Sequence, residues 1–239
     1  MKTIPTHSNR ISAIIPAYNE AKSIRSIIEI VLIHPHIAEV IVVDDGSYDG
    51  TASIAKDAGA IVISHKRNRG KAAAMETGVL KAHSEIFFFI DADIIGLSHE
   101  AMTKAINSVV SRESDMFVLV THRMWIHKHF SSIMPLLSGI RVLRREVWNC
   151  VPTNCKNRFE IELALNYFAS KNKYKITSQI VPNLTQTVKE KKRGVLRGLY
   201  QRIFMIRDIT IVILKMYVYY NFKYIAQNLA RKLQTLNLF

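Results

Sequence analysis

The sequence predicts an α/β fold in which a mostly parallel sheet carries helices on both faces. Four short runs of Val, Ile and Phe, at residues 11–15, 40–43, 61–64 and 86–90, alternate with segments of helical spacing. Each run is apolar at nearly every position, which is typical of strands that are buried on both faces. Strands that alternate with helices form parallel sheets, whose ligands bind beyond the carboxyl ends of the strands.

The segments between these runs predict the helices that cover the sheet. After the first run, Ile24, Ile27 and Val31 recur at the spacing that places them on one face of a helix. Helical patterns also follow the second and third runs, at residues 52–58 and 71–79. Beyond residue 95 the predicted elements are a helix at 99–111, a strand at 115–120, a turn, strand and helix start at 138–148, a helix that begins within 158–165 and a strand at 176–181.

Two carboxylates end the fourth run, at Asp91 and Asp93. Carboxylate oxygens one residue apart at the end of a buried strand suit Mg²⁺ or Mn²⁺, which keeps water and phosphate oxygens as its other ligands. The same pattern can also serve only as a helix cap. We interpret it as a metal and diphosphate site because other polar loops accompany it.

Polar residues also follow the first two runs, at 16–20 and 44–47, and a basic turn at 66–71 opens the third helix. The carboxyl ends of parallel strands meet at one edge of a sheet, so we expect these loops to lie close together. The adjacent aspartates of the second loop can accept hydrogen bonds from a nucleobase and a ribose hydroxyl. Gly70 lets the backbone approach a phosphate at a helix start. Together the loops predict a pocket for a nucleoside diphosphate.

Two of these residues also have a purely structural interpretation. Asp44 can cap the helix that follows it, so Asp45 is the stronger candidate for a contact with the base. Lys71 can be a solvated residue of the first helical turn rather than a phosphate ligand.

Four of the segments resemble the family 2 glycosyltransferases, which have the nucleotide-diphospho-sugar transferase (GT-A) fold. The resemblance continues through residues 138–148 and 159–165, and it covers roughly residues 10–185. Within the family, the basic C-terminal segment resembles the dolichol- and polyprenyl-phosphate sugar synthases, and Phe159-Glu160-Ile161 resembles glucosyl-3-phosphoglycerate synthases. The four matching segments are Ile14-Ile15-Pro16-Ala17-Tyr18-Asn19-Glu20, Val42-Val43-Asp44-Asp45-Gly46-Ser47-Tyr48-Asp49-Gly50-Thr51, Asn68-Arg69-Gly70-Lys71 and Phe89-Ile90-Asp91-Ala92-Asp93.

The resemblance implies roles for individual residues. Family members use Asp45 and the loop at 16–20 for the nucleotide base, Asp91 for the ribose or diphosphate side and Asp93 for the metal. We therefore expect Asp91 and Asp93 to hold Mg²⁺ or Mn²⁺. The residues expected to contact the nucleotide sugar are Pro16, Ala17, Tyr18, Glu20, Asp45, Gly70, Lys71 and Asp91.

In relatives a histidine after the last strand often joins the metal shell. Residues 182–187 contain none, which leaves water or Gln186 as the third ligand.

The transfer reaction requires groups at the leaving diphosphate and at the acceptor. A metal at Asp93 with a nearby Lys or Arg stabilises the negative charge that builds on the diphosphate. The family inverts, which calls for a base beside the acceptor. Glu160 and Glu162 are two residues apart and point about 200° apart on a helix, so at most one faces the site. We favour Glu160 as the catalytic base, and the alternative is that both are first-turn acids that interact with the helix dipole.

A phosphate acceptor would reduce the need for a base, because its second pKa is about 6 and it arrives largely ionised. Arg141, Arg144 and Arg145 are candidates to receive it, and we select Arg141. A solvated edge of the strand is the alternative for at least two of the three.

The charge of the chain indicates an anionic partner. The formal net charge is +14 and the isoelectric point is about 9.8. Residues 189–239 hold eleven Lys or Arg and two acids, so this last fifth of the chain carries +9 of the charge. No nucleic-acid recognition module accompanies it, so nucleic acid is not an expected partner.

The C-terminal segment is predicted to lie on a membrane surface. Its most apolar part, residues 203–222, contains Arg207, Asp208 and Lys215, and three charges disfavour a helix that spans the bilayer. An amphipathic helix at the interface, with basic residues on anionic lipid, fits better. The alternative is a helix packed on the domain or on a second subunit of a homo-oligomer.

Cys150 and Cys155 are expected to be free thiols in a reducing cytoplasm, because they lack a second pair or suitably spaced histidines. Residues 1–10 are polar and show no apolar segment of a signal peptide. We therefore expect a cytoplasmic protein that is peripherally attached to the inner face of the cell membrane.

The expected organisation is a catalytic domain over residues 1–188, with a nucleotide-binding half at 10–95 and an acceptor half at 96–188, followed by a basic amphipathic helical tail at 189–239. The expected function is metal-dependent transfer of a hexose from a UDP- or GDP-linked sugar to a polyprenyl phosphate or another lipid-linked acceptor. The alternatives are a soluble transferase for a small phosphorylated acceptor such as 3-phosphoglycerate, and a non-catalytic scaffold that binds a nucleotide sugar.

Overall fold

The computed structural model of the protein describes residues 9–121, 138–156 and 161–186. The chain divides into two compact units, Met1–Thr187 and Val188–Phe239, and every described residue belongs to the first. The predicted tail therefore lies outside the described residues.

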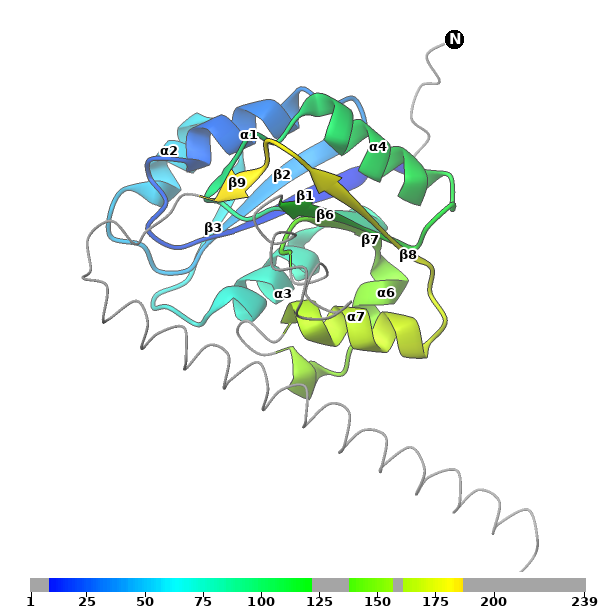
Figure 1. The fold of residues 1–239 in the computed structure, drawn as a ribbon. Coiled ribbons are helices and arrows are strands. Elements are labelled where there is room, and N and C mark those ends of the chain that lie inside the picture. The colour runs from blue at the N-terminus through cyan, green and yellow to red at the C-terminus, as the bar shows by residue number, and fades with distance from the viewer. Residues whose placement is uncertain (1–8, 122–137, 157–160, 187–239) are drawn as a thin grey trace, which may run out of the picture. The chain divides into compact units, whose positions relative to one another are not determined.

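A seven-stranded sheet in the order β3-β2-β1-β4-β7-β6-β8 forms the centre of the first unit (Figure 1). Neighbouring strands are parallel except at β7, which runs antiparallel to both β4 and β6. The predicted mostly parallel sheet is confirmed. The strands are β1 (Ile11–Ala17), β2 (Ile37–Asp44), β3 (Ile61–Ser64), β4 (Ile86–Phe89), β6 (Met116–Thr121), β7 (Arg141–Arg144) and β8 (Ile176–Val181).

Helices cover both faces of this sheet (Figure 1). All of the predicted helices within the described residues are present, with small shifts at their ends. One face carries α1 (Ile24–Leu32), α2 (Thr51–Asp57) and α4 (His99–Val110), and the other carries α3 (Lys71–Lys81), α6 (Arg145–Asn149) and α7 (Ile161–Lys171). A single 3₁₀ turn, Thr153–Cys155, separates α6 from α7 among these residues.

The two faces of the sheet have separate apolar contacts. Ile15 of β1 and Phe88 of β4 share one buried cluster with Ile28 of α1 and Ile106 of α4. On the opposite face, the ring of Phe89 lies 5.0 Å from that of Trp148 in α6. Alternate side chains of each strand thus enter different layers, as expected for strands buried on both sides.

β1 continues two residues beyond its predicted end, because Pro16 does not stop the strand. Ile14 accepts a hydrogen bond from Ile90 on the β4 side, and Ala17 accepts one from Asp45 on the β2 side. The nitrogen of Pro16 therefore faces the β4 side. Because β4 has already ended there, the missing N–H of proline costs no hydrogen bond between strands. Pro16 and Ala17 belong to the strand, and the polar loop begins at Tyr18.

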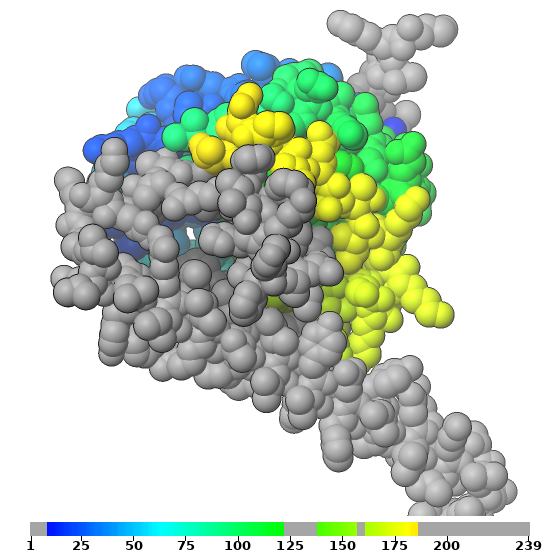
Figure 2. Space-filling view, viewed as in Figure 1, coloured from blue at the N-terminus to red at the C-terminus, as the bar shows by residue number. Residues whose placement is uncertain are grey.

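A second, two-stranded sheet was not predicted. β5 (Ile94–Ile95) pairs antiparallel with β9 (Thr185–Gln186), so that Gln186 lies opposite Ile94. A side chain at Gly96, which has φ +81°, would collide with the carbonyl of Asn183. In the space-filling view the yellow segment that carries β9 lies against the green part of the surface (Figure 2). The chain after β8 thus returns to the residue that follows Asp93.

Candidate active site

The loops after β1 and β2 are joined by hydrogen bonds. The backbone N–H of Asn19, a residue with φ 57°, donates to Ser47 Oγ at 2.9 Å, and the N–H of Tyr48 donates to Asn19 Oδ1 at 3.1 Å. The N–H of Glu20 donates to Thr51 Oγ1 at 2.9 Å. These contacts make the two loops one connected unit at the carboxyl edge of the sheet.

The residues predicted to contact the nucleotide base differ in what they can offer. Tyr18 is 42% exposed, and its ring lies edge-on to that of Tyr48 with the centroids 6.5 Å apart. Ala17 is buried in β1, so it can offer only its backbone. Pro16 and Glu20 are half-buried. Tyr18 is therefore the aromatic side chain of this loop that a ligand can reach.

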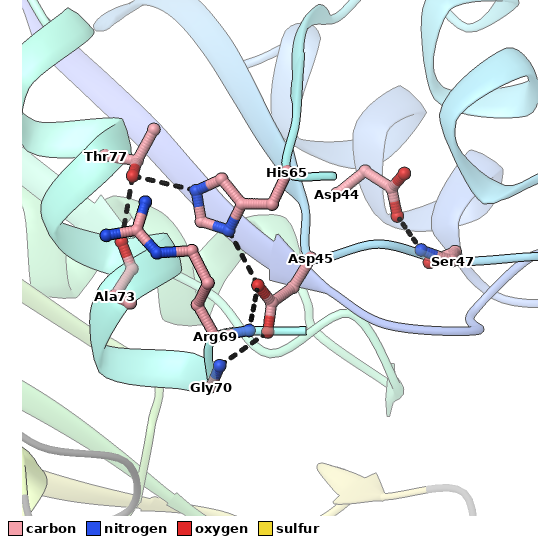
Figure 3. Close-up of polar contacts among 8 residues, drawn as sticks. All are labelled: Asp44, Asp45, Ser47, His65, Arg69, Gly70, Ala73 and Thr77. Atoms are coloured by element: carbon pink, nitrogen blue, oxygen red, sulfur yellow. Dashed lines mark hydrogen bonds and ion pairs between the residues drawn. The ribbon is translucent and has the colours of Figure 1, made fainter. Parts of the chain in front are cut away.

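The adjacent aspartates at the end of β2 diverge (Figure 3). Asp45 accepts from the backbone N–H of Gly70 at 2.7 Å and of Arg69 at 2.9 Å. Asp44 turns the other way and accepts from the N–H of Ser47 at 3.1 Å. The N-cap of α2 is Gly50, so Asp44 closes a local turn rather than capping that helix.

Lys71, the first residue of α3, forms the most strongly charged contact of the site. Its Nζ lies 2.5 Å from Asp91 Oδ1 and 2.6 Å from Glu162 Oε1, and its side chain is 17% exposed. Burial alone would lower the pKa of Lys71, but the carboxylates of Asp91 and Glu162 outweigh it and raise this pKa above its ordinary value. This environment excludes a solvated first-turn lysine.

Gly139 packs directly against this ion cluster. A β-carbon at this position would collide with Lys71 Nζ and with both carboxylate oxygens of Asp91. Arg141 supports the segment, since it donates to the carbonyl of Ser138 at 2.5 Å. The backbone before β7 therefore lies against the Lys71–Asp91 pair.

The acceptor-phosphate role predicted for Arg141 finds no support in this geometry, because Arg141 is fully buried. Its guanidinium also donates to Asn166 Oδ1 at 3.3 Å. Burial lowers the pKa of Arg141 from its usual value, and the carboxylates of Glu162 and Asp91 oppose that shift. The guanidinium of Arg141 thus adds a second positive charge near the carboxylates of Asp91 and Glu162.

The structure describes only one of the two candidate bases. Glu162 is buried in the first turn of α7 and contacts Lys71. Glu160 lies outside the described residues, so its role as the base stays a prediction.

Asp91 and Asp93 lie where β4 ends, and both are half-buried. The structure shows no group of three or more His, Cys, Asp and Glu side chains arranged for a metal in the ranges 9–121, 138–156 and 161–186. A site made of one or two carboxylates still fits Mg²⁺ or Mn²⁺, because these ions retain water and take phosphate oxygens from a substrate. The donor set therefore suits a metal that arrives with a diphosphate.

The structure is an α/β domain whose polar and charged loops gather at the carboxyl edge of a mostly parallel sheet. The sequence profile of the family described as glycosyl transferase family 2 matches residues 12–165. The chain belongs to this family, and its fold is the GT-A fold.

Curated relatives match the chain over shorter stretches. Succinoglycan biosynthesis protein ExoU of Rhizobium meliloti is 40% identical over 85 residues, which cover 34% of this chain and 25% of that protein. The 4,4'-diaponeurosporenoate glycosyltransferase of Staphylococcus aureus is 33% identical over 111 residues, which cover 44% of this chain and 30% of that protein. The matched region thus spans a third or less of the length of these relatives.

Solved structures show the same fold over a larger share of the chain. Glucosyl-3-phosphoglycerate synthase from Mycobacterium tuberculosis, in complex with Mg²⁺ and uridine diphosphate, superimposes with a TM-score of 0.71 at 20% identity. The match covers 86% of this chain and 78% of that one. The same enzyme with Mn²⁺, uridine diphosphate and phosphoglyceric acid gives a TM-score of 0.70 at 21% identity and covers the same shares.

Within residues 9–121, 138–156 and 161–186, no helix is long and apolar enough to cross a membrane. The predicted amphipathic tail lies outside them.

We expect Lys71→Met to destabilise the protein by about 3 kcal/mol, because it removes the cation that contacts both Asp91 and Glu162 and leaves two neighbouring carboxylates. Urea unfolding at pH 7 measures the free energy of unfolding. Lys81→Met is the matched control, since Lys81 is an exposed lysine of the same helix. Equal losses in the two variants would contradict the buried ion cluster.

Proposed function

We propose that the chain is a metal-dependent glycosyltransferase that moves a hexose from a nucleotide-diphosphate sugar to a polyprenyl phosphate or another lipid-linked acceptor at the cytoplasmic face of the membrane. The observation that carries the proposal is the charged cluster of Lys71, Asp91 and Glu162 at the carboxyl edge of the sheet, two residues from Asp93. Membership in the family supports the transferase chemistry.

The donor side of the reaction is assigned to the loops at this edge. Tyr18 would contact the face of the base, and Asp45 would accept a hydrogen bond from its edge. Asp93, with Asp91 beside it, would bind Mg²⁺ or Mn²⁺, and this metal supplies electrostatic stabilisation of the leaving diphosphate.

The acceptor side is assigned to the start of α7. Glu162 is fixed by Lys71, which makes it a positioning group for the sugar or the acceptor. Glu160, two residues earlier, would take the proton from an acceptor hydroxyl. With a phosphate acceptor the attacking oxygen is largely ionised, and the need for a base is smaller.

Different observations favour the lipid acceptor and the small one. The basic segment at 189–239 favours an anionic lipid surface, and one relative is named for 4,4'-diaponeurosporenoate. Structures of the M. tuberculosis enzyme in complex with phosphoglyceric acid favour the small phosphorylated acceptor as the second candidate.

Asp93→Asn is expected to lower hexose transfer at least about 100-fold, because the metal and its stabilisation of the diphosphate are lost. The assay measures transfer from UDP- and GDP-linked hexoses, with Mn²⁺, to polyprenyl phosphate and to 3-phosphoglycerate. Asp57→Asn, at an exposed acid that ends α2, is the control and should retain activity. Equal transfer by wild type and Asp93→Asn would contradict the metal role of Asp93, and no transfer by wild type would favour a binding scaffold.

The tail is expected to bind anionic membranes. Flotation of the full chain with phosphatidylglycerol vesicles should show binding that falls at least about tenfold when Lys191, Lys192 and Arg193 are changed together to Gln, because each basic residue near the surface contributes about 1 kcal/mol. The control changes three exposed lysines of the domain, Lys56, Lys81 and Lys104, and removes the same charge. Equal binding by the two triple variants would favour the soluble alternative.

A further inference from the structure

His65 is one of the most enclosed polar side chains near the site, and none of the predicted roles includes it. It directly follows β3, and its side chain is 6% exposed. Its Nδ1 lies 2.7 Å from Asp45 Oδ1, and its Nε2 lies 2.9 Å from Thr77 Oγ1 in α3 (Figure 3). The ring therefore connects the end of β2 to the helix that begins at Lys71.

The contact with Asp45 fixes one proton of the ring. An ionised carboxylate can only accept, so His65 donates through Nδ1–H. At the other end, Thr77 Oγ1 lies 2.9 Å from Nε2 and 3.0 Å from the carbonyl of Ala73. The hydroxyl has one proton, so it donates to Nε2 of the neutral ring, and it donates to Ala73 only when Nε2 itself carries a proton. Both ring nitrogens thus have partners, and the ring is held at two points.

Asp45 in turn organises the basic turn. With His65, Arg69 and Gly70 it has three donors, and a carboxylate has about four acceptor positions. The turn also packs closely on Gly46, where a β-carbon would lie 2.9 Å from the carbonyl carbon of Arg67. The three donors use three of these acceptor positions, so they set the direction of the remaining one on a carboxylate that is 5% exposed.

We propose that His65 is a positioning residue for recognition of the donor nucleotide. It orients Asp45 so that the remaining acceptor position faces the ring N–H of the pairing edge, N3–H of uracil or N1–H of guanine. Cytosine has no proton on N3 and offers only its exocyclic amino group at that edge. The same contact fixes the turn at 66–70 ahead of Lys71. This inference rests on the proposed function and names the base class that the site prefers.

Two amide variants of His65 separate the two contacts. The amide nitrogen of Asn takes the place of Nδ1, so His65→Asn keeps a donor for Asp45. The longer His65→Gln places its amide nearer Nε2, so it keeps the contact with Thr77 and loses the one with Asp45. Calorimetry on the full chain measures the Kd of UDP, GDP and CDP, and the melting temperature reports structural damage.

Wild type should bind UDP or GDP at least tenfold more tightly than CDP. We expect His65→Gln to reduce this ratio to below threefold and His65→Asn to retain most of it. If His65→Gln does not fold, His65→Leu decides instead, since it also removes the donor to Asp45 and should reduce the ratio to below threefold.

The outcomes distinguish this inference from the proposed function. Wild type that binds none of the three nucleotides would contradict the proposed function itself. Wild type that binds them without discrimination, or a His65→Gln variant that lowers the melting temperature but keeps the ratio, would overturn the positioning role and leave the transferase proposal intact.

Discussion

The arrangement of the site depends on one buried lysine that contacts two carboxylates. Lys71 comes from the start of α3, Asp91 from the end of β4 and Glu162 from the first turn of α7. Charges removed from water are stable only when they are paired with good geometry. The folded chain must therefore bring the Asp91 loop and α7 to the same point, which joins the end of β4 to a helix that begins only at Ile161.

The contacts of Asp45 and those of the charged cluster meet at the first turn of α3. On one side Asp45 accepts from the backbone of Arg69 and Gly70, immediately before Lys71. On the other side Gly139 leaves room for the ion pair, and the buried Arg141 adds a second positive charge beneath it. A shift of this helix start would move the backbone donors to Asp45 and the charged cluster together.

The sequence was sufficient for the fold class and for the edge of the sheet that carries the site, because strand runs and the polar residues that end them are local signals. It was insufficient for contacts between distant residues. Glu162 is 91 positions from Lys71, and helical spacing alone left the choice between Glu160 and Glu162 open. The full burial of Arg141 and the pairing of β5 with β9 likewise depend on tertiary packing. His65 could have been noticed, since it is the first residue after a strand that ends at this edge.

A double-mutant cycle with Asp91→Asn and Glu162→Gln tests most directly whether the two carboxylates share Lys71. The free energy of unfolding is measured without metal. Each single change leaves Lys71 one carboxylate, whereas the double variant leaves a buried cation with none. The double variant is expected to lose at least about 1 kcal/mol more than the sum of the single losses, because only then does Lys71 lose both carboxylates. Losses that add within about 0.5 kcal/mol would show that the two carboxylates act independently, and would contradict the shared role of Lys71.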